Sequence, residues 1–150
     1  MIKNIIFFFT LLILTACTNQ GFNQQNTMVP NTNVNFSIST PSFISLSGIG
    51  NYHIEAGQGF MGVIVFNIDG NTFRAFDLGC PYVNPNECQV PMTIENGTGE
   101  MSCANCANDD ITFTQQITGV TIGEGDSEKT YYLREYSAFL ENGSVRITNF

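Results

Sequence analysis

Three patterns of apolar and polar residues follow one another along the chain. Residues 5–14 form an apolar run in which only Thr10 is polar. Residues 18–35 are rich in Asn, Gln and Thr and contain no charged side chain. From Phe36 onward, short runs of alternating apolar and polar residues are separated by Gly, Asn and Asp. The chain is therefore expected to contain a leader, a linker and one folded domain.

The alternation after Phe36 is typical of antiparallel β-strands, and no twelve-residue window shows a helical period. Asp69-Gly70, Asn96-Gly97 and Asn142-Gly143 each lie between two such runs and favour tight hairpin turns. The sequence thus predicts an all-β sandwich or barrel over residues 36–150. The expected strands are Phe36–Ser39, Asn51–Glu55, Phe60–Asn67, Thr72–Asp77, Val90–Glu95, Glu100–Cys103, Ile111–Thr114, Tyr131–Ser137 and Ser144–Asn149.

The leader has the layout of a secretory signal peptide. Lys3 precedes the apolar run, and the small residues Thr15-Ala16 precede Cys17. A transmembrane helix would need about 20 apolar residues, and the polar residues 18–20 come too early. The Leu-Thr-Ala-Cys sequence that ends at Cys17 resembles the lipobox of bacterial lipoproteins. This resemblance implies that residues 1–16 are cleaved off as a signal peptide and that acyl chains on Cys17 anchor the protein to a membrane.

Residues 17–35 are expected to form the lipidated end and a disordered tether, because they hold too few apolar side chains to build a core. An acidic residue after the lipidated cysteine marks retention or surface export in some bacteria, and residues 18–20 contain none. We therefore expect a cell-envelope protein anchored in the outer membrane and facing the periplasm.

Charge narrows the expected partners and chemistry. Without residues 1–16 the chain has four basic and thirteen acidic residues, a formal charge of −9. Four basic residues are too few to form a patch for phosphate groups, so no nucleic acid is expected as a partner. The membrane contact expected is the lipid on Cys17, and the sequence identifies no protein partner. His53 is the only histidine, and its pattern is that of an ordinary strand residue. Because no other plausible catalytic base is present, we expect no enzymatic activity.

Four cysteines remain after Cys17, namely Cys80, Cys88, Cys103 and Cys106. An even number in an exported protein allows two disulfides, with three ways to pair them. Four is also the ligand number of a closed metal site, and the two-residue gap between Cys103 and Cys106 suits one metal ion. The same gap occurs in thiol redox pairs.

Two of these cysteines follow expected strands in loops that carry a recognisable pattern. Residues 73–82 read FRAFDLGCPY, and residues 101–106 read MSCANC. These segments resemble the Rieske iron–sulfur domain family, in which a strand followed by Cys-Pro-His and a later Cys-x-x-His loop supply the ligands. Residues 111–113, 131–136 and 145–147 fall where that family has its closing strands. The resemblance covers residues 60–149 and implies a Rieske-like β domain.

The ligand positions depart from the family pattern. Cys80 and Cys103 match its two cysteine ligands, but Tyr82 and Cys106 stand at the two histidine positions. A Rieske centre needs two imidazole ligands on one iron, so this chain is not expected to build one.

Three interpretations of the four cysteines follow. They form two disulfides that staple the loops, they hold Zn or an all-cysteine 2Fe–2S cluster, or Cys103 and Cys106 form a redox pair. The exported setting favours disulfides, and facing loops favour pairs between the loops. We expect a disulfide-stapled binding or structural module without a cofactor, and the alternative is an electron-transfer protein with a cysteine-ligated metal.

Overall fold

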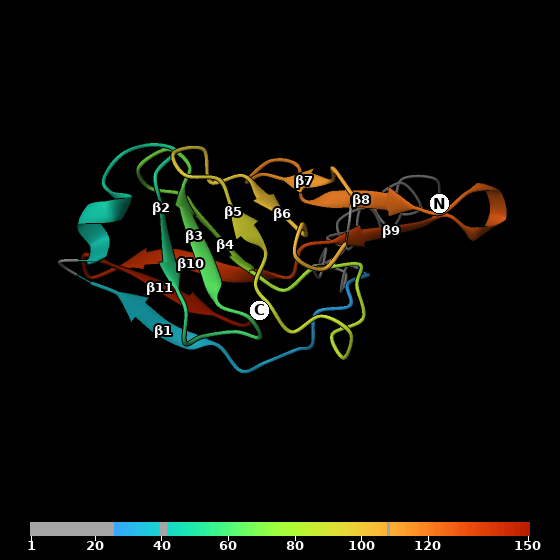
Figure 1. Cartoon of the computed structure of the whole chain (residues 1–150). Coiled ribbons are helices and arrows are strands. Elements are labelled where there is room, and N and C mark those ends of the chain that lie inside the picture. Colours follow the sequence, from blue (N-terminus) through green and yellow to red (C-terminus); the bar gives the residue numbers. More distant parts are fainter. Residues whose placement is uncertain (1–25, 40–41, 108) are drawn as a thin grey trace, which may run out of the picture.

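The computed structural model of the chain describes residues 26–39, 42–107 and 109–150 (Figure 1). The expected signal peptide, Cys17 and residues 18–25 of the expected tether lie outside the described residues. Within the described ranges, no helix has the length and apolar character needed to cross a membrane.

The described residues form an all-β protein, as the alternating pattern predicted. Its strands are β1 (Asn35–Ile38), β2 (Tyr52–Glu55), β3 (Val63–Asn67), β4 (Phe73–Asp77), β5 (Thr93–Ile94), β6 (Met101–Ser102), β7 (Thr112–Phe113), β8 (Gly119–Ile122), β9 (Lys129–Tyr132), β10 (Glu135–Glu141) and β11 (Ser144–Thr148). The only helical turns in the described ranges are the 3-10 segments η2 (Ser42–Leu46) and η3 (Gly125–Ser127).

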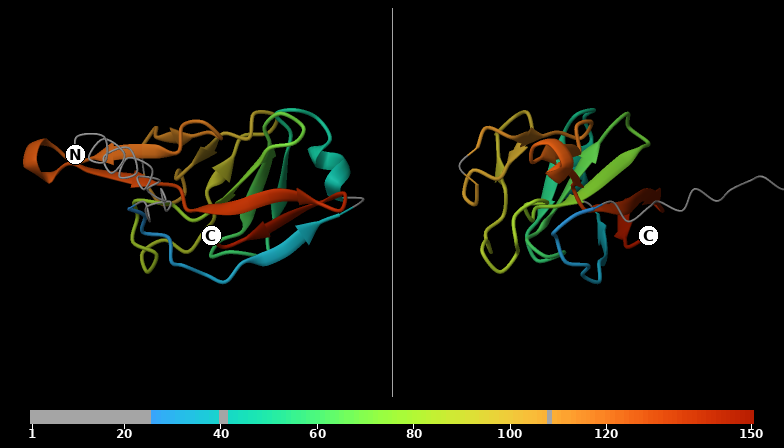
Figure 2. Two further views of the ribbon diagram at one scale, coloured as in Figure 1. Left: turned by 180° about the vertical axis from the view of Figure 1, so that it is seen from behind. Right: turned by 90° about the vertical axis from the view of Figure 1, so that its right-hand side faces the viewer.

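The main sheet has six strands in the order β1-β11-β10-β4-β3-β2, and its paired neighbours are antiparallel (Figure 1). It curls into half of a barrel. Three short strands form a second sheet in the order β5-β6-β7, and β8 pairs with β9. The β8–β9 hairpin extends away from the rest of the domain (Figure 2).

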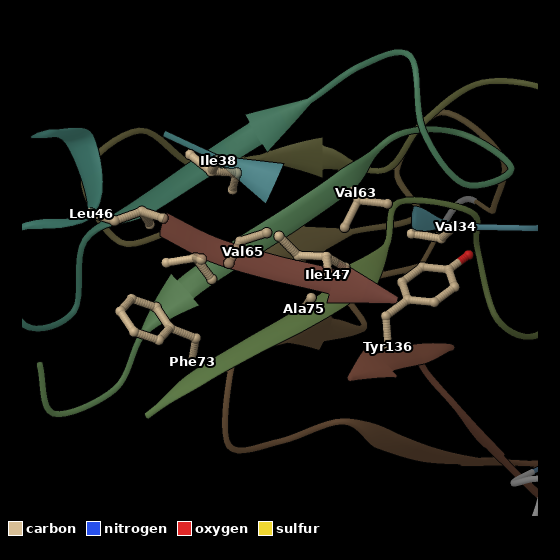
Figure 3. Packing of buried hydrophobic residues seen from close by; sticks show 10 residues of the cluster. Val34, Ile38, Leu46, Val63, Val65, Phe73, Ala75, Tyr136 and Ile147 are labelled. Carbon is tan, nitrogen blue, oxygen red and sulfur yellow. The ribbon is translucent and has the colours of Figure 1, made fainter. Parts of the chain in front are cut away.

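Two hydrophobic cores lie on opposite faces of the main sheet, and β3 supplies side chains to both. Val63 and Val65 belong to the first core, whereas Ile64 and Phe66 belong to the second. Because side chains alternate across a strand, a strand buried on both faces reads as a continuous apolar run. Figure 3 shows the first core, where side chains from η2 and from β1, β3, β4, β10 and β11 meet. The second core lies under the small β5-β6-β7 sheet and contains Met101 and Phe113.

The three predicted hairpins form, but only Asn142-Gly143 is a tight two-residue turn. Asp69-Gly70 and Asn96-Gly97 lie in longer connections, between the paired residues Asn67 and Phe73 and the paired residues Ile94 and Met101. The two turn residues Asn142 and Gly143 have φ angles of 50° and 76°, and they connect the paired residues Glu141 and Ser144. Gly70 and Gly97 also have positive φ angles, of 95° and 92°. Glycine is favoured at such positions because it has no side chain to clash with the backbone.

Several details of the strand prediction are wrong. The expected strands Phe60–Asn67 and Val90–Glu95 are shorter, at Val63–Asn67 and Thr93–Ile94. The strand β8 was not predicted, and the expected strand Tyr131–Ser137 is two strands separated by Leu133-Arg134. At this break the backbone changes partners, because Leu133 N donates to Thr118 O at 2.8 Å and Asp77 N donates to Arg134 O at 2.9 Å. The chain thereby passes from the small β8–β9 sheet to the main sheet. The local sequence pattern does not predict this change, because the hydrogen-bond partners are distant in sequence.

The predicted tether is wrong for its second half, because residues 26–34 pack against the domain. Val29 and Val34 are 2% and 1% exposed. The Met28 amide donates to Pro81 O at 2.7 Å, and the Arg134 guanidinium donates to Val29 O at 2.9 and 2.7 Å. A few well-placed apolar side chains and backbone hydrogen bonds to distant segments order this stretch, although its composition is polar. We call residues 26–34 the N-terminal strap.

Candidate functional site at the two cysteine loops

The four cysteines lie in two loops that the sheets bring together. Cys80 and Cys88 lie in the loop between β4 and β5, and Cys103 and Cys106 lie between β6 and β7. They form the disulfides Cys80–Cys103 and Cys88–Cys106, with Cα–Cα distances of 5.6 and 5.5 Å. The expectation of pairs between the loops is confirmed, and the bridges interleave along the chain.

The two bridges differ in their surroundings. Cys80 is 7% exposed and Cys103 is 1% exposed, and both belong to the second core. We call this pair the inner bridge. Cys88 and Cys106 are only half-buried, and we call their pair the outer bridge.

Local backbone hydrogen bonds shape each loop around its cysteines. In the first loop, Met92 N donates to Leu78 O at 2.7 Å and closes the base, and Cys88 N donates to Asn84 O at 3.1 Å in a turn. In the second loop, Cys106 N donates to Cys103 O at 2.7 Å, so the two cysteines lie on one tight turn.

Tyr82 links the same two loops through its side chain. Its hydroxyl donates to Asp109 Oδ2 at 2.9 Å, and its ring lies 6.3 Å from that of Phe113 between centroids. Burial of the ring, together with the hydrogen bond to Asp109 and its negative charge, raises the pKa of the Tyr82 hydroxyl. Tyr82 therefore stays protonated at neutral pH, and its oxygen acts as a hydrogen-bond donor in the loop contact.

The residues present do not fit a Rieske cluster. Cysteines that share a disulfide have no thiolate to offer a metal, and Tyr82 is held by Asp109. Among the described residues, no group of three or more His, Cys, Asp or Glu side chains is placed to hold a metal ion.

A buried carboxylate, which the residue patterns did not predict, fixes the start of the first cysteine loop. Asp77 ends β4 and is fully buried. Its Oδ1 accepts hydrogen bonds from Gly79 N at 2.8 Å and Met61 N at 3.2 Å. Its Oδ2 accepts from Phe60 N at 2.6 Å and the Tyr136 hydroxyl at 2.8 Å.

Burial raises the pKa of Asp77, and these four hydrogen bonds oppose that rise. The carboxylate connects β4, β10, the turn before β3 and the backbone just ahead of Cys80. The available signal was a charged residue at the end of the apolar strand FRAFD, where a carboxylate is costly unless it is hydrogen-bonded.

The Asp77 carboxylate also explains why residue 59, in the turn before β3, is a glycine. A Cβ atom added to Gly59 would clash with Asp77 Oδ2, and Gly59 has a φ of +71°. The Tyr136 hydroxyl continues the network to Thr32 Oγ1 of the N-terminal strap at 3.3 Å. The strap is thus connected to the base of the first cysteine loop through two side chains.

His53 lies on β2, as expected, beside two polar side chains. Its Nδ1 is 3.2 Å from Ser45 Oγ, and its Nε2 is 3.7 Å from Glu55 Oε2. The Ser45 hydroxyl also donates to Ser42 O at 2.6 Å, and in that arrangement its oxygen accepts the proton of His53 Nδ1.

The comparisons with protein-family models, with curated proteins and with solved structures give no match for this chain.

Proposed function

We propose that this chain is a lipid-anchored bacterial cell-envelope protein whose Rieske-like domain has exchanged its cluster ligands for two disulfides. It acts as a binding or structural module rather than as an enzyme or an electron carrier with a cysteine-ligated metal. Acyl chains on Cys17 hold it in the outer membrane, facing the periplasm. The observation that carries the proposal is the pair of bridges between the loops after β4 and β6.

Several features of these loops support the proposal. The bridged residues Cys80 and Cys103 occupy the positions of the family's two cysteine ligands. Tyr82 and Cys106, at the two histidine positions, form a second layer of contacts between the same loops. A Rieske domain places two loops around a cluster, and here covalent bonds and one hydrogen bond perform the same positioning. Two disulfides also suit an oxidising compartment outside the cytoplasm.

The two disulfides make the loops rigid. Each bridge is worth about 2–4 kcal/mol in typical proteins because it limits the unfolded chain. Loops held at a fixed spacing present their exposed side chains to a partner with little ordering cost. This favours a binding or structural role.

Optical and metal analysis of the protein tests this role. We expect protein purified without oxygen to be colourless, with less than about 0.1 iron or zinc per chain, because the cysteines are engaged with one another. A visible absorption band with stoichiometric iron would contradict the proposal and favour the electron carrier, and stoichiometric zinc would favour a structural metal site.

The anchor is tested separately with Cys17→Ser. This substitution removes the thiol that receives the lipid, so incorporation of a radioactive fatty acid and partition into detergent should both be lost. A Cys88→Ser variant is the matched control and should label like the unaltered protein. A Cys17→Ser protein that still labels would overturn the anchor.

A further inference from the structure

We propose that the outer bridge, Cys88–Cys106, is a thiol–disulfide exchange site that accepts electrons from dithiols, whereas the inner bridge stays closed. This goes beyond a purely structural role for both bridges, and it does not depend on the lipid anchor. It rests on the unequal burial of the two bridges and on the contacts that hold the loops independently of the outer one.

Access separates the two bridges. Exchange begins when a thiolate attacks a disulfide sulfur, so the sulfur has to be reachable from solvent. Cys103 is 1% exposed and lies in the second core, which shields the inner bridge from attack. The outer bridge is half-buried, and its sequence neighbours Glu87, Gln89 and Asn105 are exposed.

The loops keep their positions when the outer bridge opens. The inner bridge still joins them, and the Tyr82 hydroxyl still donates to Asp109. The hydrogen bond from Met92 N to Leu78 O still closes the first loop. Because Cys106 is three residues from Cys103 on one tight turn, its thiol remains close to Cys88 and the bridge can form again.

Local charge selects the class of reductant. Neither cysteine loop, over residues 78–92 and 103–111, contains Lys, Arg or His, and Glu87, Asp109 and Asp110 are acidic. The released thiols therefore gain no cationic stabilisation as thiolates, and a single external thiol is readily expelled again. A dithiol overcomes this reversal, because its second thiol resolves the mixed disulfide within one molecule.

The exchange balances as a two-electron step. A dithiol thiolate attacks one sulfur of the outer bridge, the Cys88–Cys106 bond breaks, and the released cysteine sulfur takes up a proton. The second thiol of the reductant loses its proton and attacks the mixed disulfide. The second cysteine sulfur leaves and takes up a proton, and the reductant is released as a disulfide. The protein gains two electrons and two protons, and the dithiol loses both.

Titration of the full chain with dithiothreitol under native conditions tests the inference. Reduced thiols are alkylated with iodoacetamide and then located by peptide mass spectrometry. We expect Cys88 and Cys106 to be alkylated at dithiothreitol concentrations at least tenfold below those that open the inner bridge. The far-ultraviolet circular dichroism should be unchanged at that stage. One molecule of oxidised dithiothreitol should form per chain.

The Cys88→Ser/Cys106→Ser protein is the matched control, because it retains the inner bridge and should form no oxidised dithiothreitol at those concentrations. A monothiol, 2-mercaptoethanol, at equal total thiol should leave most of the outer bridge closed. The inference is overturned if both bridges open together, if the outer bridge opens only with loss of the folded signal, or if the monothiol is equally effective.

Discussion

At the scale of single residues, Asp77 holds several segments together, a role that its neighbours in the sequence do not indicate. It is fully buried, and each of its two carboxylate oxygens accepts two hydrogen bonds. Three of the donors are backbone amides from the segments on either side of β3 and β4. An unpaired buried amide costs about 1–3 kcal/mol, so these donors depend on the carboxylate.

Asp77→Asn should therefore destabilise the domain by about 2–3 kcal/mol in urea unfolding. Whichever way the amide is turned, its NH2 group faces a backbone N–H donor at Oδ1 or Oδ2. Tyr136→Phe removes one donor and leaves the carboxylate, so it should cost only about 1 kcal/mol. Equal stability of Asp77→Asn and the unaltered protein would refute the role assigned to this carboxylate.

Tyr82 gives a prediction with a defined pH dependence. Its pKa is raised in the folded protein above the ordinary value of 10. The unfolded chain therefore loses the phenolic proton first, and the stability that this group contributes is present below pH 10 and lost as pH rises above it. Each such tyrosine contributes a slope of up to about 1.4 kcal/mol per pH unit.

Tyr82→Phe should thus flatten the loss of stability between pH 10 and pH 11 when unfolding is followed by circular dichroism. Part of the slope remains, because the pKa of Tyr136 is also raised, mainly by burial and by the nearby Asp77. Tyr131→Phe is a suitable control for the removal of a hydroxyl from a strand residue. An identical slope in the unaltered and Tyr82→Phe proteins would contradict the assignment.

At the scale of elements, the sequence pattern predicted the turns and strands whose conformation depends on neighbouring residues. The Asn142-Gly143 turn and the alternating strands around it are specified by neighbouring residues, and both are confirmed. The break at Leu133-Arg134 depends on hydrogen bonds to Thr118 and Asp77, which are distant in sequence. The order of residues 26–34 likewise comes from packing against β9, β10 and the first cysteine loop rather than from their own composition.

The N-terminal strap supplies the prediction at this scale. Deleting residues 26–33 should lower the free energy of unfolding by at least about 2 kcal/mol, because it exposes apolar surface that Val29 covers and itself buries. It also removes Thr32, which contacts Tyr136, and the amide of Met28, which binds Pro81.

Thermal and urea unfolding of this deletion should be compared with a deletion of the same length over residues 18–25. Deleting the strap is expected to lower the free energy of unfolding clearly more than deleting residues 18–25. If both deletions change stability equally little, the contacts of the strap contribute nothing to the fold.

At the scale of the whole molecule, the main sheet separates two cores and brings two distant loops to one place. The sequence indicated that two cysteine-bearing loops follow strands, and resemblance to the Rieske family implied that they meet. The sequence allowed three ways to pair the four cysteines, because the partner of each cysteine depends on how β4 and β6 are positioned in the sheets. The different burial of the two bridges likewise follows from the second core, whose side chains come from segments spread over residues 64–133.

The most direct test of the account is a disulfide map of the full chain, made by proteolysis at acidic pH without reduction and peptide mass spectrometry. We expect linked peptides for Cys80–Cys103 and Cys88–Cys106, and no free thiol among these four residues after denaturation. Peptides that join Cys103 to Cys106, or four free thiols together with bound iron or zinc, would contradict the account.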